Sequence, residues 1–111
     1  MPIYITQGRY TREAIKGMIV KPEDRADAVA RLLSKTGGRL LGYYLTFGEY
    51  DFLTIAECPS DVQMAAVLLA AGSGGGVTDL RTTVALTSVE AKGALAAASD
   101  LAPSFKSAGG T

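Results

Sequence analysis

An acid and a tyrosine stand side by side at Tyr50 and Asp51, in the stretch GEYDFLTIAE that runs from Gly48 to Glu57. A carboxyl group removed from water has a raised pKa, so Asp51 is a candidate proton carrier or ligand-orienting group. The same residue types also suit a turn, because glycine permits a tight hairpin and aspartate accepts hydrogen bonds from backbone amides. Turn chemistry explains the pattern without a ligand, and the sequence therefore favours a structural role for Asp51.

A ligand site around Asp51 would need partners from other strands. Tyr50 is its neighbour, and Arg81, Tyr4 and Tyr44 stand in segments that we expect to be strands. An acid, an arginine and tyrosines around an apolar cavity could orient a small polar or aromatic ligand. If Asp51 does act on a ligand, we predict that these five residues form the small-molecule site, and we assign no residue to catalysis.

The amino end offers a different kind of chemistry. Once the initiator methionine is removed, the amine of Pro2 could act as a general base, since a model α-amino group has a pKa of about 8. The start MPIYITQGR resembles that of the N-terminal-proline tautomerases. Those enzymes consist of two βαβ repeats, whereas a central hairpin is expected here. The simpler interpretation is that Pro2 begins an edge strand.

Missing residue types exclude several classes of enzyme and of metal site. The chain has no histidine and a single cysteine, Cys58, so Ser-His-Asp and Cys-His catalysis, histidine zinc sites and histidine-ligated haem are excluded. An internal disulfide is excluded for the same reason. The glycine-rich run at residues 72–76 lacks the Gly-Lys-Ser/Thr ending of a phosphate loop, and a connector is favoured. We expect no metal and no cofactor.

Composition and charge limit the range of partners. The chain has 111 residues, which fits one domain, and 48% of them are hydrophobic. Eleven basic residues balance eleven acidic ones, which disfavours nucleic acid and membrane surfaces as partners and eases self-association. No apolar run approaches the roughly 20 residues of a membrane span, and no secretory leader is recognisable. A cytoplasmic location is the expectation.

The first half of the chain predicts a strand and two helices. Residues 2–8 alternate as a strand does and are rich in β-branched side chains. Thr11 can cap a short helix over residues 12–19. Pro22 suits the start of a second helix, with Glu23 and Asp24 in its first turn, and Gly37 and Gly38 end it.

The second half predicts a hairpin, two capped helices and a fourth strand. The run RLLGYYLTFGEYDFLTIAE divides at residues 47–49 into two strands. Ser60 to Gln63 and Thr87 to Glu90 are capping boxes that start helices, the second reaching about Ala98. Residues 77–86 form a strand between them. We therefore expect one domain over residues 1–98 and a mobile tail over residues 99–111.

Strand alternation separates the side chains of the hairpin into two sets. Tyr43 and Tyr44 must point to opposite faces of the sheet. In the second hairpin strand, Asp51, Leu53, Ile55 and Glu57 share one face, and Tyr50, Phe52, Thr54 and Ala56 share the other. The sequence does not tell which set faces the helices.

The order of elements predicts an α+β fold. A hairpin flanked by two helical crossovers gives a ferredoxin-like split βαβ sheet, β-α-β-β-α-β, here with an additional C-terminal helix. Its helices cover one face only. We expect the other face to carry apolar and aromatic residues, which makes a second subunit the expected cover.

Two segments resemble the GYD-domain family. They are GYYLTFGEYDFLTIAECPSD and the opening PIYITQGRYTREAIKGM, and the Gly-x-Tyr-Asp hallmark falls on Gly48, Tyr50 and Asp51. The similarity covers most of residues 2–90. It implies a dimeric α/β barrel in which two ferredoxin-like units pack sheet against sheet. It implies no reaction, because the family has no generally established activity.

The leading hypothesis is a homo-oligomer, a dimer or a multiple of dimers, that binds a small molecule or serves as an assembly module. Its site would lie in the barrel or at the subunit interface. An alternative is a cofactor-independent monooxygenase-like enzyme, since such enzymes of the antibiotic-biosynthesis type share the dimeric α/β barrel. Whether the chain catalyses any reaction stays open at this point.

Overall fold

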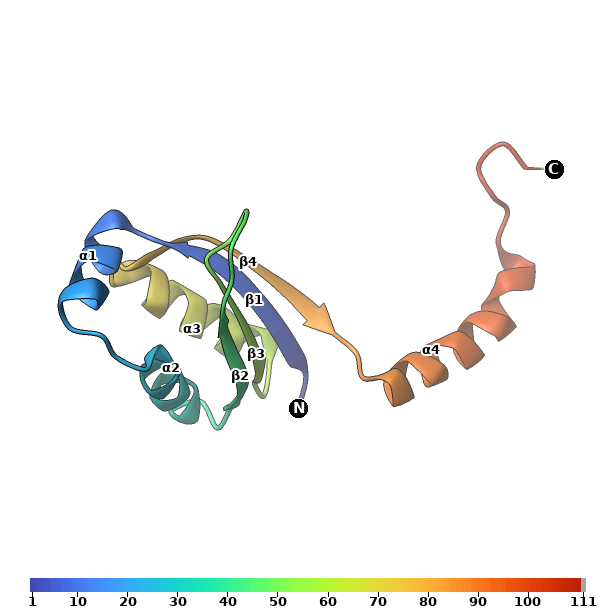
Figure 1. Cartoon of the computed structure of the whole chain (residues 1–111). Helices are drawn as coiled ribbons and strands as arrows, with labels where there is room; N and C mark the ends of the chain where they lie inside the picture. The colour runs from blue at the N-terminus through green and yellow to red at the C-terminus, as the bar shows by residue number, and fades with distance from the viewer. Residues whose placement is uncertain (111) are drawn as a thin grey trace.

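A four-stranded antiparallel sheet forms the frame of the protein in the computed structural model, which describes residues 1–110 (Figure 1). The strands are β1 Ile3–Tyr10, β2 Arg39–Leu45, β3 Phe52–Glu57 and β4 Val77–Ala85. Across the sheet they lie in the order β2-β3-β1-β4, with β3 and β1 in the centre. This is the ferredoxin-like arrangement, so the predicted α+β fold class is confirmed. Pro2 precedes a central strand, and the expectation of an edge strand was wrong.

Three helices lie on one side of the sheet. Helices α1 Arg12–Val20 and α2 Arg25–Ser34 connect β1 to β2, and α3 Asp61–Ser73 connects β3 to β4. Figure 1 shows all three on the same side of the strands, and α2 and α3 pack on the sheet. In the part of the chain that the structure describes, none of the helices has the length and apolar character needed to cross a membrane.

The starts of the helices follow from local side-chain chemistry. Thr11 caps α1, and the capping box at the start of helix α4 Ser88–Leu101 has both of its hydrogen bonds, between Thr87 and Glu90. Helix α2 begins at Arg25, later than predicted from Pro22. Its N-cap is Asp24, whose carboxylate accepts a hydrogen bond from the amide of Ala26 at 3.0 Å. The side chain of Asp24 therefore sets the start of α2, and Pro22 lies in the preceding loop.

The hydrophobic core lies between the sheet and the helices α2 and α3. Its members are buried side chains from both layers: Tyr4, Leu33, Ala56, Cys58, Met64 and Val67. Leu33 is 1% exposed and Cys58 is fully buried. Phe52 and Thr54 are buried on the same side of β3 as Ala56, so this set of the hairpin residues faces the helices.

The other face of the sheet has no helix over it and is called the open face below. Its centre is apolar, because Ile5 of β1 lies opposite Ile55 of β3, and Tyr44 of β2 lies opposite Leu53. Ile3 extends this surface toward Ala85 of β4. The structure thus agrees with the expected apolar character of the uncovered face.

The C-terminal helix projects from the rest of the molecule (Figure 1). Helix α4 continues to Leu101 and is followed by the short 3-10 helix η1 Ala102–Ser104, so helical structure extends past Ala98 into the expected tail. The radius of gyration is 18.0 Å, whereas a compact chain of this length has one of about 13 Å. Mobility of the tail stays a prediction, and Thr111 lies outside the described residues.

Candidate ligand-binding site

Asp51 fastens the end of the β2–β3 hairpin to β1. Its carboxylate oxygen Oδ2 accepts a hydrogen bond from the amide of Tyr10 at 2.9 Å. Its own amide donates to the carbonyl oxygen of Gly8 at 2.8 Å, and its carbonyl accepts from the amide of Thr46 at 2.8 Å. These bonds give Asp51 the structural role that turn chemistry predicted, because they satisfy backbone groups at a point where the strand ladder has ended.

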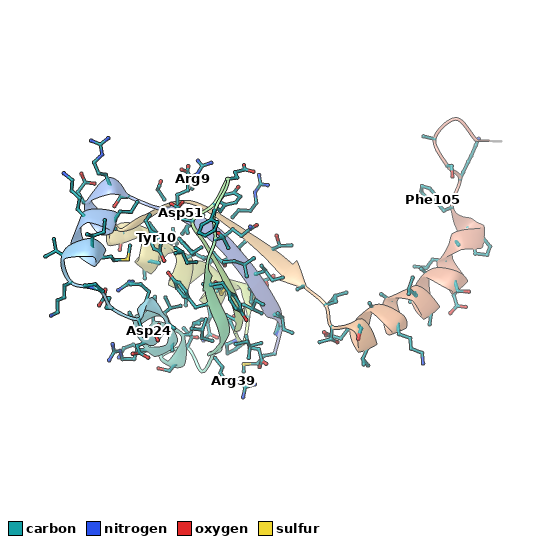
Figure 2. All side chains as sticks on the ribbon, viewed as in Figure 1. Arg9, Tyr10, Asp24, Arg39, Asp51 and Phe105 are labelled. Atoms are coloured by element: carbon teal, nitrogen blue, oxygen red, sulfur yellow. The ribbon has the colours of Figure 1, made fainter. Side chains whose placement is uncertain are left out.

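Arg9 holds the tip of the same hairpin. Its Nε donates to the carbonyl oxygen of Glu49 at 2.7 Å, and its guanidinium lies 5.6 Å from the centre of the Tyr50 ring. Gly48 has a φ of 117°, a backbone conformation that favours glycine. Figure 2 shows Arg9, Tyr10 and Asp51 close together at this end of the sheet. Tyr50 therefore belongs to the tip of the hairpin.

Tyr4 lies on the helix-covered face, near the opposite end of β1. It pairs with Ala56 and is 2% exposed. Its hydroxyl donates to the Asp61 carboxylate at 2.6 Å. This hydrogen bond, with burial and the negative charge of Asp61, raises the pKa of Tyr4 to about 12. Tyr4 thus joins β1 to the start of α3.

Arg81 and Tyr44 belong to the open face, but to its two opposite edges. Arg81 of β4 lies opposite Gln7, and Tyr44 of β2 lies opposite Leu53. The two central strands separate them. Tyr4 lies on the helix-covered face while Arg81 and Tyr44 lie on the open face, so the five predicted ligand-binding residues do not line one cavity within one subunit. A shared site at an interface between subunits stays a prediction.

A cavity of about 380 Å³ lies between the sheet and the helices α2 and α3, and is called the helix–sheet cavity below. Most of its lining is apolar, with Val29, Leu32, Phe52, Val67, Leu68 and Ala71 among the contributors. Thr6, Thr54 and Tyr43 supply hydroxyl groups, and Arg25 is the one charged residue in the described lining. A small apolar molecule with an oxygen-bearing end suits this composition.

A cleft of about 520 Å³ adjoins this cavity, between α1, the start of α2 and the hairpin. It shares Arg25 and Tyr43 with the cavity and is also lined by Tyr10 and Asp51. The side chains shared by both spaces stand where a ligand would pass from one to the other. Asp51 therefore lies in the outer cleft and not among the described lining residues of the cavity.

Tyr10 and Tyr43 form a hydroxyl pair at this boundary. Their hydroxyl oxygens share a hydrogen bond, and both rings lie against Phe52, with centroid distances of 5.0 and 6.0 Å. Burial raises the pKa of Tyr43, and the bond to Tyr10 raises it further, so Tyr43 stays protonated at neutral pH. A phenol both donates and accepts, and whichever hydroxyl accepts the shared bond keeps its own O–H for a ligand.

Arg25 can change its partner at little cost. Its Nη1 lies 2.9 Å from a carboxylate oxygen of Glu23, and the two side chains are 37% and 54% exposed. Ion pairs this exposed contribute little to stability. A ligand anion or carbonyl oxygen could therefore replace Glu23. Among residues 1–110, no three His, Cys, Asp or Glu side chains lie close enough together to hold a metal ion.

Sequence analysis missed Tyr10, Tyr43 and Arg25. Alternation along β1 would have placed Tyr10 on the face of Tyr4, and alternation along β2 separates Tyr43 from Tyr44. Strand alternation would therefore have identified Tyr10 and Tyr43 once the helix-covered face was known. Nothing local to the sequence pairs the two hydroxyls, which lie 33 positions apart in the chain.

Comparison with known proteins gives a family match and a fold match. A family model described as the GYD domain matches residues 4–95. A search of curated proteins finds no match.

Two solved structures share the architecture. TTHA0845 from Thermus thermophilus is 16% identical, with 78% of this chain and 95% of that chain covered and a TM-score of 0.51. The hypothetical protein PHS023 from Pyrococcus horikoshii is 12% identical, with 78% and 92% covered and a TM-score of 0.51. At these identities the likeness shows a common fold and nothing about the ligand.

Proposed function

The chain belongs to the GYD domain family, and we propose that it is a homo-oligomer whose subunits each bind a small, mainly apolar molecule in the helix–sheet cavity. The observation that carries this proposal is the cavity itself. It is partly open to solvent and mainly apolar, as ligand pockets are. A space of about 380 Å³ falls within the range of ligand pockets.

The polar groups of the cavity define the kind of ligand. Its apolar body would lie against Phe52, Val67 and Leu68, and its oxygen-bearing end would point toward Tyr43 and Arg25. The free O–H of the tyrosine pair can donate to a carbonyl, phenolate or carboxylate oxygen, and the guanidinium of Arg25 adds a positive charge. A small carboxylic acid, phenol or ketone satisfies both requirements.

The open face supports self-association. Ile3, Ile5, Leu53, Ile55 and Tyr44 form its apolar part, and an apolar sheet face is stable when another layer covers it. A balanced charge leaves little electrostatic repulsion between copies. A second copy on this face would leave the helix–sheet cavity accessible from the side of α1 and α2.

Filling the cavity tests the binding proposal. Ala71 lines the cavity and Ala66, in the same helix, is exposed outside it, so Ala71→Leu and Ala66→Leu are a matched pair. The probe is the fluorescent apolar anion 1-anilinonaphthalene-8-sulfonate, titrated into folded protein. We expect Ala71→Leu to weaken binding about tenfold or more, as overpacking by a few methyl groups does, and Ala66→Leu to leave it unchanged.

Two results would contradict the proposal. Equal affinity of both variants would show that the probe binds elsewhere on the surface. Native mass spectrometry of gently purified protein gives the second readout, because it reports the subunit number and any retained small molecule together. A bare monomer would remove the homo-oligomer from the proposal, whereas a retained mass that is lost in Ala71→Leu would support the cavity as the site.

A further inference from the structure

Helix α4 carries an apolar stripe that nothing in its own subunit covers. Ala91, Ala94, Leu95, Ala98 and Leu101 recur at the i, i+3, i+4, i+7 spacing of one helix face and are called the α4 stripe below. Leu95 is 71% exposed and Leu101 is 69% exposed. Within residues 1–110, no residue of α4 is buried.

An uncovered helix of this length needs a packing partner. The helix has 14 residues, and isolated helices of about 12–15 residues are marginal in water. The capping box fixes its start, but a cap contributes only about 1 kcal/mol. Most of the stability of such a helix comes from packing its apolar face, so the α4 stripe is expected to lie against another surface.

Helix α4 and the residues after it, called the arm below, begin next to the open face. Helix α4 follows β4, an edge strand, after only Leu86 and Thr87, and the last residue of β4, Ala85, pairs with Ile3 of the open face. In Figure 1 the helix leaves this corner and points away from α1, α2 and α3. Figure 2 places Phe105, which is 76% exposed, at the far end of the arm.

We propose that α4 is an exchanged arm, which packs the α4 stripe against a second copy of this chain. Each copy supplies one uncovered arm and one uncovered apolar sheet face that begin at the same corner, so a two-fold dimer can satisfy both kinds of surface reciprocally. Helix α4 has 14 residues and is therefore about 21 Å long, which is enough to cross a four-stranded sheet about 15 Å wide.

The charges of helix α4 argue against a lipid surface as the occupant. The charged residues of the helix are Glu90, Lys92 and Asp100, which sum to one negative charge. Lys92 and Asp100 lie away from the α4 stripe, and Glu90 borders it. Helices that lie in a membrane interface are rich in lysine and arginine on their polar face. The proposal rests on the homo-oligomer proposed above and is independent of the ligand.

A matched pair of substitutions tests the role of the stripe. Ala94 lies in the α4 stripe, and Ala96 points to the opposite side of the helix because two residues turn the helix by about 200°. Both are exposed, and glutamate is a good helix former at either place. We expect Ala94→Glu to raise the dissociation constant of the dimer about tenfold or more in analytical ultracentrifugation, and Ala96→Glu to leave it unchanged.

A cross-linking experiment locates the arm. The photoreactive residue benzoylphenylalanine is placed at Leu95, and equal amounts of ¹⁴N- and ¹⁵N-labelled protein are unfolded, mixed and refolded before irradiation. An exchanged arm gives cross-linked peptide pairs of which about half carry both labels, as random pairing of subunits requires. The control carries the same photoreactive residue at Ala96.

Three results would contradict the exchanged arm, and they can be told apart. A dimer whose cross-links join only equally labelled peptides, or that forms no cross-link at Leu95, would overturn the exchanged arm and leave the homo-oligomer intact. A monomer in the ultracentrifuge at all concentrations would overturn both. Equal dissociation constants for Ala94→Glu and Ala96→Glu would also exclude the α4 stripe as the contact surface.

Discussion

Replacing Asp51 separates its structural role from a role in ligand binding. Asp51→Ala removes the acceptor of the Tyr10 amide, which then lies partly buried without a partner. Hydrogen bonds to a charged group contribute about 1.5–3 kcal/mol, so we expect a loss of about 2 kcal/mol in the free energy of unfolding. Asp51→Asn keeps an acceptor oxygen but not the charge, and a neutral hydrogen bond is about half as strong, so the expected loss is about 1 kcal/mol.

Urea unfolding followed by circular dichroism measures both losses. The slope of the free energy against urea should stay constant, since neither change alters the surface exposed on unfolding. For a domain of this size, 2 kcal/mol corresponds to a fall in Tm of about 8 °C. The bonds from the Asp51 amide to Gly8 and from Thr46 to the Asp51 carbonyl belong to the backbone and remain in both variants.

The order of the three proteins is the decisive result. The hydrogen bond to Tyr10 is supported if the free energy of unfolding is highest for the wild type, lower for Asp51→Asn and lowest for Asp51→Ala. If both variants unfold at the urea concentration of the wild type while binding of 1-anilinonaphthalene-8-sulfonate is lost, the structural account is refuted and the carboxylate acts on the ligand. Ala66→Leu, which lies outside both the cavity and the hairpin, is the reference for ordinary substitution effects.

Two further predictions concern packing and pH. A Cβ atom at Gly8 would lie 2.6 Å from the Phe52 ring, so Gly8→Ala should lower the free energy of unfolding by about 1–3 kcal/mol. A Cβ atom at Gly17, inside α1, meets nothing within 4 Å, so Gly17→Ala should raise the free energy of unfolding by up to about 1 kcal/mol. Urea midpoints check both, and a stable Gly8→Ala protein would contradict the packing argument. Tyr4 has a pKa of about 12 in the folded protein, against an ordinary value of 10.0, so its contribution to the free energy of unfolding is complete below pH 10 and falls as the pH rises toward 12. Unfolding at about pH 9 and about pH 11 should therefore show a larger alkaline loss for wild type than for Tyr4→Phe, and equal losses would exclude the bond to Asp61.

Local chemistry explains why much of the fold was predictable. The caps at Thr11 and Thr87 depend on groups three residues apart, and the hairpin follows from two strand-like runs around Gly48. Pro22 misled the prediction of α2, because proline tolerates the start of a helix without requiring it, while the Asp24 side chain makes an actual hydrogen bond to the first turn.

The candidate site was less predictable because its residues meet only through the sheet. Strand order places β3 between β2 and β1, and this brings Tyr10 and Tyr43 against Phe52. Tyr44 was the residue predicted from the sequence, and strand alternation places it on the open face. A choice between neighbouring tyrosines needs the identity of the covered face, and that is a property of the packed fold.

Each of the three hallmark positions has a structural role in the hairpin. Gly48 supplies a positive φ, Tyr50 stacks under the guanidinium of Arg9, and Asp51 bonds the amide of Tyr10. These three residues hold the hairpin against β1 and so position Tyr43 and Phe52 beside the cavity. None of the three belongs to the described cavity lining. Proteins that share the hallmark can therefore share the scaffold while their lining residues differ, and the ligand of each would follow from the lining and not from the motif.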